Sequence, residues 1–314
     1  PSSISNKLLE YRYYEKLIES IPEIRGLEIP FFGDDIHSLG YKFLLDIIEP
    51  NWNNIITCIP GTMANLSKNP HFGLASDDSN GRNEAILMCE RVNKTLHKIN
   101  DFYGKKSVLA IQLVTAPSVP VDGVSSSKDA LLRSMEEILN WDWDSSKIVI
   151  EHADQSLSNF PFEKGFLSLD SEIDVLKQLS SVYNVGVTIN WARSAIEGRS
   201  VSKPLEHINL ALKYDLLAGL IFSGVSNNDK NYGNWKDTHM PFAQSYNVEY
   251  FEKNSLLTYE NIFNTLESLY NKKLDYIGLK LNSMPMDQAD IERRVGLNKN
   301  AVMILENIAL DLNN

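Results

Sequence analysis

The chain of 314 residues contains seven short, nearly continuous apolar runs, with stretches of helical periodicity between them. Runs of this kind are typical of parallel strands covered by helices on both faces of a sheet. The expected strands cover residues 26–32, 55–61, 108–117, 147–154, 185–194, 216–225 and 276–282. The expected helices cover residues 7–20, 38–48, 83–100, 127–140, 170–182, 203–214, 258–271 and 287–312, with Ser126 or Ser127 and Asp170 as N-caps. Repeated βα units predict an α/β fold.

The spacing of these units predicts a (β/α)8 TIM barrel. Such a barrel needs eight strands, one more than the apolar runs supply. The chain begins with Pro1 and a helical pattern starts almost at once, so we expect the first strand to lie upstream of Pro1. An extended segment within residues 1–8 that pairs into the sheet would contradict this hypothesis. The alternative is an open doubly wound sheet.

Residues 1–314 are expected to form one domain, because no linker-like, low-complexity or charge-block segment interrupts them. Barrels of this class commonly reach such a length. The longest stretch without clear periodicity, residues 223–255, follows an expected strand. Barrel enzymes place their active-site loops at this position.

A formal net charge of −11 and a pI near 5.1 disfavour a nucleic-acid partner. Cys58 lies in a strand run and Cys89 in a helical pattern, so both are expected to be reduced core residues of a cytoplasmic protein. The sequence contains no run of 18 or more apolar residues, so no membrane-spanning helix is expected. The sequence leaves the oligomeric state open, a homo-oligomer included.

Polar side chains suited to chemistry stand at the ends of the apolar runs. In a barrel, the carboxyl ends of the strands converge on one face, where active sites are found. Burying charges there costs several kcal/mol per charge unless they are paired or face a wet cavity. The strand-end candidates are Glu28, Thr62, Gln112, Thr115, Glu151, His152, Asn190, Arg193, Ser223 and Lys280. A ligand site explains this concentration of polar residues most simply.

Glu151 is the strongest single candidate, because it ends the run Lys147-Ile-Val-Ile and is expected to lie within reach of the barrel axis. A carboxylate there suits a general base, a metal ligand or an acceptor for a sugar hydroxyl. The alternative is a structural carboxylate paired with Arg193 or Lys280. Strand alternation turns His152 away from the interior if Glu151 points in, so a helix-facing histidine is as good an interpretation as a catalytic one.

The segment 190–199 follows the next strand and mixes an amide, an indole, guanidiniums and a carboxylate. Arg193 and Arg199 suit a clamp for an anionic group, and Trp191 suits stacking on a sugar ring. The alternative for Arg199 is an ion pair with Glu197 on a solvated loop.

The long loop carries Trp235, Asp237 and His239. Aromatic residues beside an acid and a histidine suit a lid that covers a polar ligand and supplies an acid or base. A lid held by aromatic packing, without a catalytic role, is the alternative. Asp237 and His239 also form a weak candidate metal pair, whereas no glycine-rich phosphate loop or established zinc or serine-hydrolase motif is present.

The order of these motifs resembles the xylose isomerase-like superfamily of barrels, which includes sugar isomerases, epimerases and relatives of endonuclease IV. The stretches CIPGTM, NPHFGLAS, NWARSAIEGR and FSGVS also resemble an uncharacterised family within that group. The resemblance starts at the superfamily's second strand. In its active members a divalent metal is held by a set of carboxylates and histidines; carried over, these positions fall on Glu151, Asn190, Arg193, Ser223 and Lys280. Of these positions, only Glu151 still carries a side chain of the metal-binding type. The resemblance therefore implies that the side-chain cations of Arg193 and Lys280 take the place of the metal.

These observations predict an enzyme of the isomerase, epimerase or lyase type that moves protons on a sugar or sugar acid. Glu151 is the expected base, Lys280 and Arg193 stabilise an oxyanion, and His239 or Asp237 is the acid. Lys280 is expected to act as a fixed cation, with a neutral amine as its alternative. The expected substrate-binding residues are Glu28, Gln112, Asn190, Trp191, Arg199, Ser223 and Trp235. No cofactor or metal is expected. The alternatives are a non-catalytic sugar-binding barrel and a metal enzyme that uses Glu151, His152, Asp237 and His239.

Overall fold

The computed structural model describes residues 6–285 and 290–313, and within these ranges it confirms each predicted strand. The strands are β1 (Glu28–Pro30), β2 (Asn54–Thr57), β3 (Val108–Leu113), β4 (Lys147–Glu151), β5 (Val185–Asn190), β6 (Leu217–Phe222) and β7 (Tyr276–Leu279). They are shorter than the apolar runs that predicted them, because the last residues of several runs belong to the following loop or helix.

The helices follow the predicted alternation, with two additions. They are α1 (Lys7–Ser20), α2 (Tyr41–Leu45), α3 (Ile59–Leu66), α4 (Ser79–Tyr103), α5 (Lys128–Ile138), α6 (Leu169–Leu179), α7 (Trp191–Gly198), α8 (Lys203–Lys213), α9 (Tyr259–Glu267) and α10 (Ile291–Asn313). The sequence did not predict α3 and α7. Thr62, which had been assigned to a strand end, lies in α3, where the Pro at the start of the helix needs no hydrogen-bonded N–H.

The strands follow one another in the sheet in chain order, β1 to β7. The pairs β1–β2, β2–β3, β3–β4, β4–β5 and β6–β7 are parallel. Consecutive parallel neighbours joined by helical crossovers are the pattern of a TIM barrel rather than of a doubly wound sheet, in which the strand order reverses.

The chain separates into two compact units. Unit 1 comprises residues 1–23, 189–210 and 219–314, and unit 2 comprises residues 24–188 and 211–218. The division falls within β5 and β6 rather than in a linker. The prediction of a single domain over 1–314 stays a prediction.

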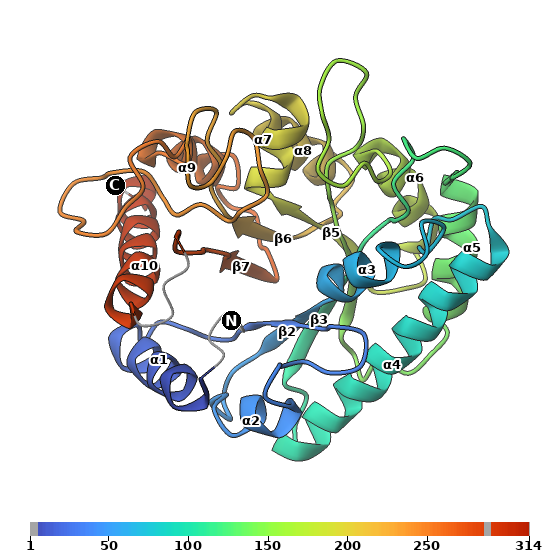
Figure 1. Cartoon of the computed structure of the whole chain (residues 1–314), viewed down its shortest axis with the longest axis horizontal. Helices are drawn as coiled ribbons and strands as arrows, with labels where there is room; N and C mark the ends of the chain where they lie inside the picture. Colours follow the sequence, from blue (N-terminus) through green and yellow to red (C-terminus); the bar gives the residue numbers. More distant parts are fainter. Residues whose placement is uncertain (1–5, 286–289, 314) are drawn as a thin grey trace. The chain divides into compact units, whose positions relative to one another are not determined.

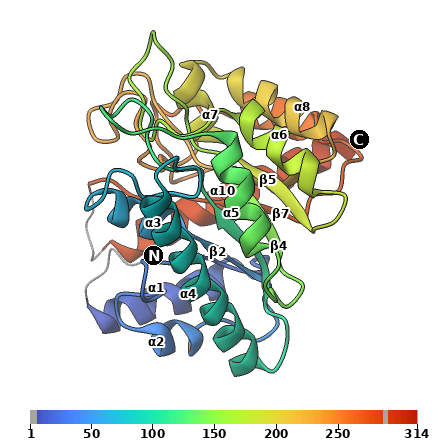
Figure 2. The ribbon, with the colours of Figure 1, turned by 90° about the vertical axis from the view of Figure 1, so that its right-hand side faces the viewer.

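Unit 2 contains β1 to β4 and the helices α2 to α6. Asp78 caps α4 by accepting a hydrogen bond from the Gly81 N–H at 2.7 Å, and the helix ends at Gly104 in the left-handed conformation. Ser127 caps α5, as predicted, whereas Ser168 rather than Asp170 caps α6. The helix α5 packs between α4 and α6, and Figure 2 shows α4 and α5 running beside each other.

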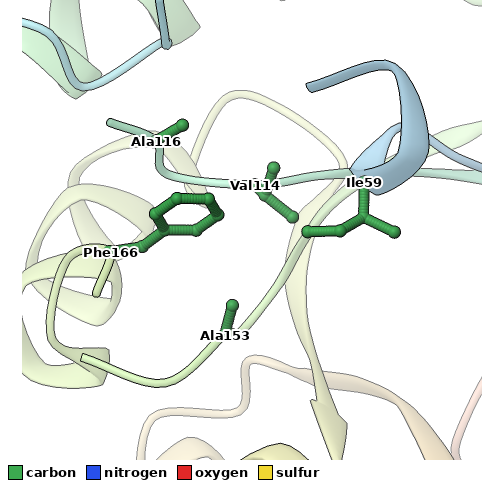
Figure 3. Packing of buried hydrophobic residues seen from close by; sticks show 5 residues of the cluster. All are labelled: Ile59, Val114, Ala116, Ala153 and Phe166. Atoms are coloured by element: carbon green, nitrogen blue, oxygen red, sulfur yellow. The ribbon is translucent and has the colours of Figure 1, made fainter. Parts of the chain in front are cut away.

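An apolar cluster lies where β3 and β4 pass into their loops. It consists of Ile59, Val114, Ala116, Ala153 and Phe166, all buried. Figure 3 shows the Phe166 ring beside Val114 and Ala116, with Ala153 facing it from the segment after β4. Burial of these side chains fixes the start of both loops, which form part of the same face of unit 2.

Unit 1 contains β7, α1, α7, α9 and α10. The terminal helices α1 and α10 pack against each other, as Figure 1 shows, and α10 also packs against α9. Asn6 caps α1 through hydrogen bonds to the N–H groups of Leu8 and Leu9, so residues 6–8 enter a helix and not the sheet. Residues 1–5 lie outside the described residues, and the position of a further strand stays a prediction. No helix in the described part of the chain is both long and apolar enough to cross a membrane.

Candidate active site

Glu151 ends β4 and is completely buried. Its carboxylate accepts a hydrogen bond from the Thr57 hydroxyl on β2 at 3.2 Å. Gln112 on β3 pairs in register with Thr57 on one side and with Val149 on the other. Since alternate residues of a strand share a face, Thr57, Gln112 and Glu151 point to the same side of the sheet. The structure therefore joins two of the predicted strand-end residues in one polar group.

His152 points to the opposite side of β4. Its Nδ1 lies 2.8 Å from the Glu172 carboxylate on α6, and the other Glu172 oxygen accepts a hydrogen bond from Thr115 at 2.6 Å. All three side chains are buried. The helix-facing interpretation of His152 is confirmed. Glu151 and His152 lie on opposite faces of β4, and the predicted metal-enzyme alternative stays a prediction.

Glu172 and Asp154 were missed as functional candidates. The signal for Asp154 was present, since it closes the run Lys147-Ile-Val-Ile-Glu-His-Ala-Asp. Its buried carboxylate accepts hydrogen bonds from the N–H groups of Glu163 at 2.6 Å and Lys164 at 3.1 Å. Asp154 therefore holds the loop that follows β4. Glu172 lies in the first turn of α6. Acidic residues are common at this position of a helix, so the sequence did not indicate that this one is buried and hydrogen-bonded.

Glu28 lies at the start of β1, opposite Ile55, and not at the strand's carboxyl end. The strand is only three residues long and ends at Pro30, which pairs with Thr57. Glu28 is thus two positions below the level of Thr57. The assignment of Glu28 to the carboxyl-end face was wrong, because the apolar run extended beyond the paired strand.

In unit 1, Asn190 joins β5 to α7. Its side-chain oxygen accepts hydrogen bonds from the Arg193 N–H at 3.4 Å and from the Ser223 hydroxyl at 2.9 Å. The side-chain nitrogen of Asn190 is buried and has no hydrogen-bond partner among the described residues. The predicted residues Asn190 and Ser223 are therefore brought together, and one amide donor is left for a ligand or water.

Arg193, Asp237 and His239 lie in a row in unit 1, with Asp237 in the middle. The Arg193 Nε donates to Asp237 Oδ2 at 3.1 Å, and both side chains are almost fully buried. The other Asp237 oxygen lies 3.3 Å from His239 Nδ1, while the His239 side chain is 29% exposed. One carboxylate thus bridges a buried guanidinium and an imidazole that reaches the surface.

Backbone hydrogen bonds anchor the loop between β6 and α9, which carries Asp237 and His239. Gly224 and Met240 exchange two of them, at 2.7 and 3.1 Å, in an antiparallel bridge. The Asn282 N–H donates to the His239 carbonyl oxygen at 2.7 Å, which attaches the loop to the segment after β7. His239 has a φ of +56°, in the left-handed region that non-glycine residues adopt uncommonly.

Tyr232 adds a further anchor that the sequence did not reveal. Its hydroxyl lies 3.0 Å from the Asn282 carbonyl oxygen and 3.1 Å from Glu252, and accepts a hydrogen bond from the Met284 N–H at 3.0 Å. Burial raises the pKa of Tyr232, and the Glu252 charge raises it further, so the hydroxyl stays protonated and remains a donor. Burial also raises the pKa of Glu252, although Arg293 opposes this effect.

Arg199 and Trp235 contact each other. Arg199 donates to the Trp235 carbonyl oxygen at 3.1 Å, and its guanidinium carbon lies 5.7 Å from the centre of the indole ring. Glu197 lies 3.3 Å from His207 on α8. Arg199 therefore contacts the loop between β6 and α9 at Trp235. Its predicted role as an anion clamp stays a prediction.

Trp191 is buried, and its indole N–H lies 3.3 Å from the Thr265 hydroxyl on α9. This packing of α7 against α9 leaves no ring face exposed, which contradicts the predicted stacking on a sugar. Trp235 is half-buried and remains the aromatic candidate.

Lys280 directly follows β7 and is half-buried, and its N–H donates to the Phe222 carbonyl oxygen at 3.0 Å. It lies two residues before Asn282, whose N–H donates a hydrogen bond to the His239 carbonyl oxygen. The predicted pairing of Lys280 with Glu151 joins residues of different units and stays a prediction, as does its role as a fixed cation.

The predicted metal pair Asp237 and His239 has its Oδ1 and Nδ1 atoms 3.3 Å apart. The Arg193 guanidinium already pairs with the other carboxylate oxygen, and its positive charge opposes a second cation at the same group. A metal role and an acid–base role for this pair both stay predictions.

Solved structures of low sequence identity share the fold. A D-tagatose 3-epimerase-like protein is 15% identical, with a TM-score of 0.59, over 95% of this chain and 97% of that one. The 3-keto-D-glucoside 4-epimerase YcjR from E. coli is 11% identical, with a TM-score of 0.56, over 96% of this chain and 97% of that one. The TIM-barrel class and the resemblance to xylose isomerase-like barrels are thereby confirmed for the fold.

The sequence comparisons are more specific. "Uncharacterized protein STM3670" from Salmonella typhimurium (strain LT2) is 36% identical over 297 residues, which cover 95% of this chain and 90% of the relative. The model of a family described as "Domain of unknown function (DUF4862)" matches residues 2–297. The chain therefore belongs to the DUF4862 family, whose fold is that of the sugar epimerase and isomerase barrels.

Proposed function

We propose that this chain is an enzyme that transfers protons on a sugar or sugar acid, in an isomerase, epimerase or lyase reaction. The observation that carries the proposal is the arrangement of Arg193, Asp237 and His239. The buried Asp237 carboxylate lies 3.3 Å from the His239 imidazole, whose side chain is 29% exposed and can exchange a proton with a ligand.

The substrate class is inferred from the fold and from the polar groups. Two proteins of the same fold bear the names of sugar epimerases, one acting on a 3-keto-D-glucoside. In unit 2, the hydroxyl, amide and carboxylate groups on β2 to β4 suit the recognition of sugar hydroxyls. In unit 1, the side-chain amide of Asn190 offers a donor of the same kind. Glu151 is proposed as the general base and Lys280 as an electrostatic stabiliser, and Glu151→Gln tests the first of these roles.

Carbon-bound hydrogen exchange tests the proposal without assuming a product. The chain is incubated in D₂O with a panel of aldoses, ketoses and sugar acids, and NMR records deuterium incorporation at carbons next to the carbonyl group. His239→Gln is expected to slow the exchange by about 10²–10⁴-fold, the usual contribution of general acid–base catalysis. His97→Gln is the matched control, because His97 lies on α4 in unit 2 and its Nε2 lies 3.0 Å from the Asp142 carbonyl oxygen.

Asp237→Asn distinguishes a positioning role from a purely structural one. Loss of the carboxylate charge is expected to lower kcat and to change its pH profile, because the imidazole loses the group that stabilises its cation. Full exchange activity in His239→Gln would remove the histidine from the mechanism. A thermal shift with sugars, but no exchange with any of them in the wild type, would replace the enzyme by a non-catalytic sugar-binding protein.

A further inference from the structure

Unit 2 carries an open cavity, and none of the residues Arg193, Asp237 and His239 lines it. Its volume is about 440 Å³. The walls come from the loop after β3, the loop after β4 and the start of α6. The cavity is lined by Val119, Pro120, Ser126, Gln155, Ser156, Phe166, Leu167, Ser168 and Ser171. This volume lies within the range of small-molecule sites in proteins.

The cavity has rigid walls, because the two loops are tied together. The Val119 N–H donates to the Gly165 carbonyl oxygen at 3.0 Å, and the Ser118 hydroxyl donates to the Lys164 carbonyl oxygen. Buried Asp154 accepts hydrogen bonds from two N–H groups of the second loop. Phe166 belongs both to the cavity wall and to the apolar cluster of Figure 3. The cavity is therefore preformed on an ordered base.

The lining contains hydroxyls and one amide but no charged side chain. Four serines and Gln155 supply donors and acceptors, whereas Phe166, Pro120 and Leu167 supply apolar faces. The Ser126 hydroxyl oxygen is buried and has no hydrogen-bond partner in the described ranges 6–285 and 290–313. A buried hydroxyl of this kind favours a ligand that brings its own hydrogen-bonding groups.

Exposed apolar side chains stand on the same two loops. Val119 and Val121 on the first loop are 43% and 41% exposed, and Phe160 and Phe162 on the second are 42% and 37% exposed. A Cβ at Gly165 would lie 2.8 Å from the Phe162 ring and 3.1 Å from Pro120, so the Phe162 ring and Pro120, which lines the cavity, both lie close to this glycine. Aromatic faces beside neutral hydroxyls suit a sugar ring, whose C–H face is apolar and whose edge is polar.

We infer that this cavity binds a neutral saccharide unit, as a second site that does not depend on the proposed catalytic chain. The absence of charged lining residues disfavours sugar phosphates and uronates, whose charge would have no partner there. An interface with another protein would leave the hollow, hydroxyl-lined interior unfilled. The exposed aromatic residues then serve as stacking surfaces for the sugar ring or for a neighbouring sugar unit.

Saturation-transfer NMR on the full chain tests this inference with methyl β-D-glucopyranoside and methyl β-D-xylopyranoside. Both probes lack a free carbonyl group, so isomerase turnover does not change them. Glucose 6-phosphate and glucuronate are the anionic comparisons. We expect saturation transfer to at least one of the neutral glycosides and weaker transfer to the anions. No transfer to either glycoside, or tighter binding of an anion, would overturn the inference.

Three variants locate the binding. Ser156→Phe fills the cavity and should raise the Kd of the bound glycoside at least tenfold, whereas Ser158→Phe, on the exposed part of the same loop, should leave it unchanged. Ser126→Ala removes one buried hydroxyl and should raise the Kd about fivefold, the equivalent of one neutral hydrogen bond. Thermal unfolding verifies that each variant folds.

His239→Gln separates this inference from the proposed function, because it should leave the glycoside Kd unchanged. Equal Kd values in Ser156→Phe and the wild type would move the glycoside elsewhere and refute the site. A dimer in sedimentation that Phe162→Asp dissociates, together with no glycoside binding, would identify the surface as a contact between copies and would also refute it.

Discussion

Replacement of Glu172 by Leu should be among the most destabilising single changes in unit 2. Glu172 extends from the first turn of α6 and holds two buried partners from different strand ends, Thr115 at 2.6 Å and His152 at 2.8 Å. Leu has a similar volume but accepts no hydrogen bond. The substitution therefore removes both acceptors without leaving a large cavity.

The expected magnitude follows from the two orphaned groups. A buried polar group without a partner costs about 1–3 kcal/mol, so two such groups cost roughly 2–6 kcal/mol. Glu172→Gln keeps one acceptor oxygen and should fall between Glu172→Leu and the wild type.

Urea unfolding followed by circular dichroism gives the free energies of unfolding. Asp170→Leu is the matched control, because Asp170 lies in the same first turn of α6 but is exposed. It measures the loss of the favourable helix-terminal charge, about 0.3–1 kcal/mol. If Glu172→Leu costs no more than Asp170→Leu, the buried chain from Thr115 through Glu172 to His152 does not stabilise the fold and the reasoning fails.

Three further outcomes are expected. Gly224→Ala should speed amide hydrogen exchange in the lid, because the added Cβ would lie 2.6 Å from the Met240 carbonyl oxygen; unchanged exchange would show that the bridge is not needed to anchor the lid. Burial raises the pKa of Cys89 to about 12 and that of Cys58 well above its usual range, so both remain thiols at a pH of about 8 and should react with Ellman's reagent only after unfolding; fast labelling of the folded chain would contradict their burial. Glu151→Gln should abolish carbon-bound hydrogen exchange of the sugar panel while changing stability by only about 1 kcal/mol, and retained exchange would remove Glu151 as the base.

The alternation of apolar runs was sufficient to predict the strands and their parallel order, because a strand buried on both faces needs a continuous apolar run whatever its neighbours are. The same local rule predicted that His152 faces away from Glu151. Two helices escaped prediction for equally local reasons. Pro60 and Gly61 resemble a turn, although Pro is favourable in a first helical turn, and α7 starts directly at the end of β5 without a connecting loop.

For the candidate site residues, the sequence indicated which residues to consider but not which partners they have. Sequence position alone was enough to select Glu151, Asn190, Arg193 and Ser223, since each follows or ends a strand. That Arg193 pairs with Asp237, 44 residues further along the chain, depends on the path of a loop that has no periodicity.

Only the tertiary structure decided which polar residues became partners. Burial at Trp191, the helix-side pairing of Glu172 and the hydroxyl-lined cavity all arise from contacts between segments far apart in the chain. A side chain's own sequence neighbours set its direction on a strand or helix, but the residue it meets depends on how loops and helices pack. The fold was therefore readable from local periodicity, whereas the chemistry of the site required the three-dimensional structure.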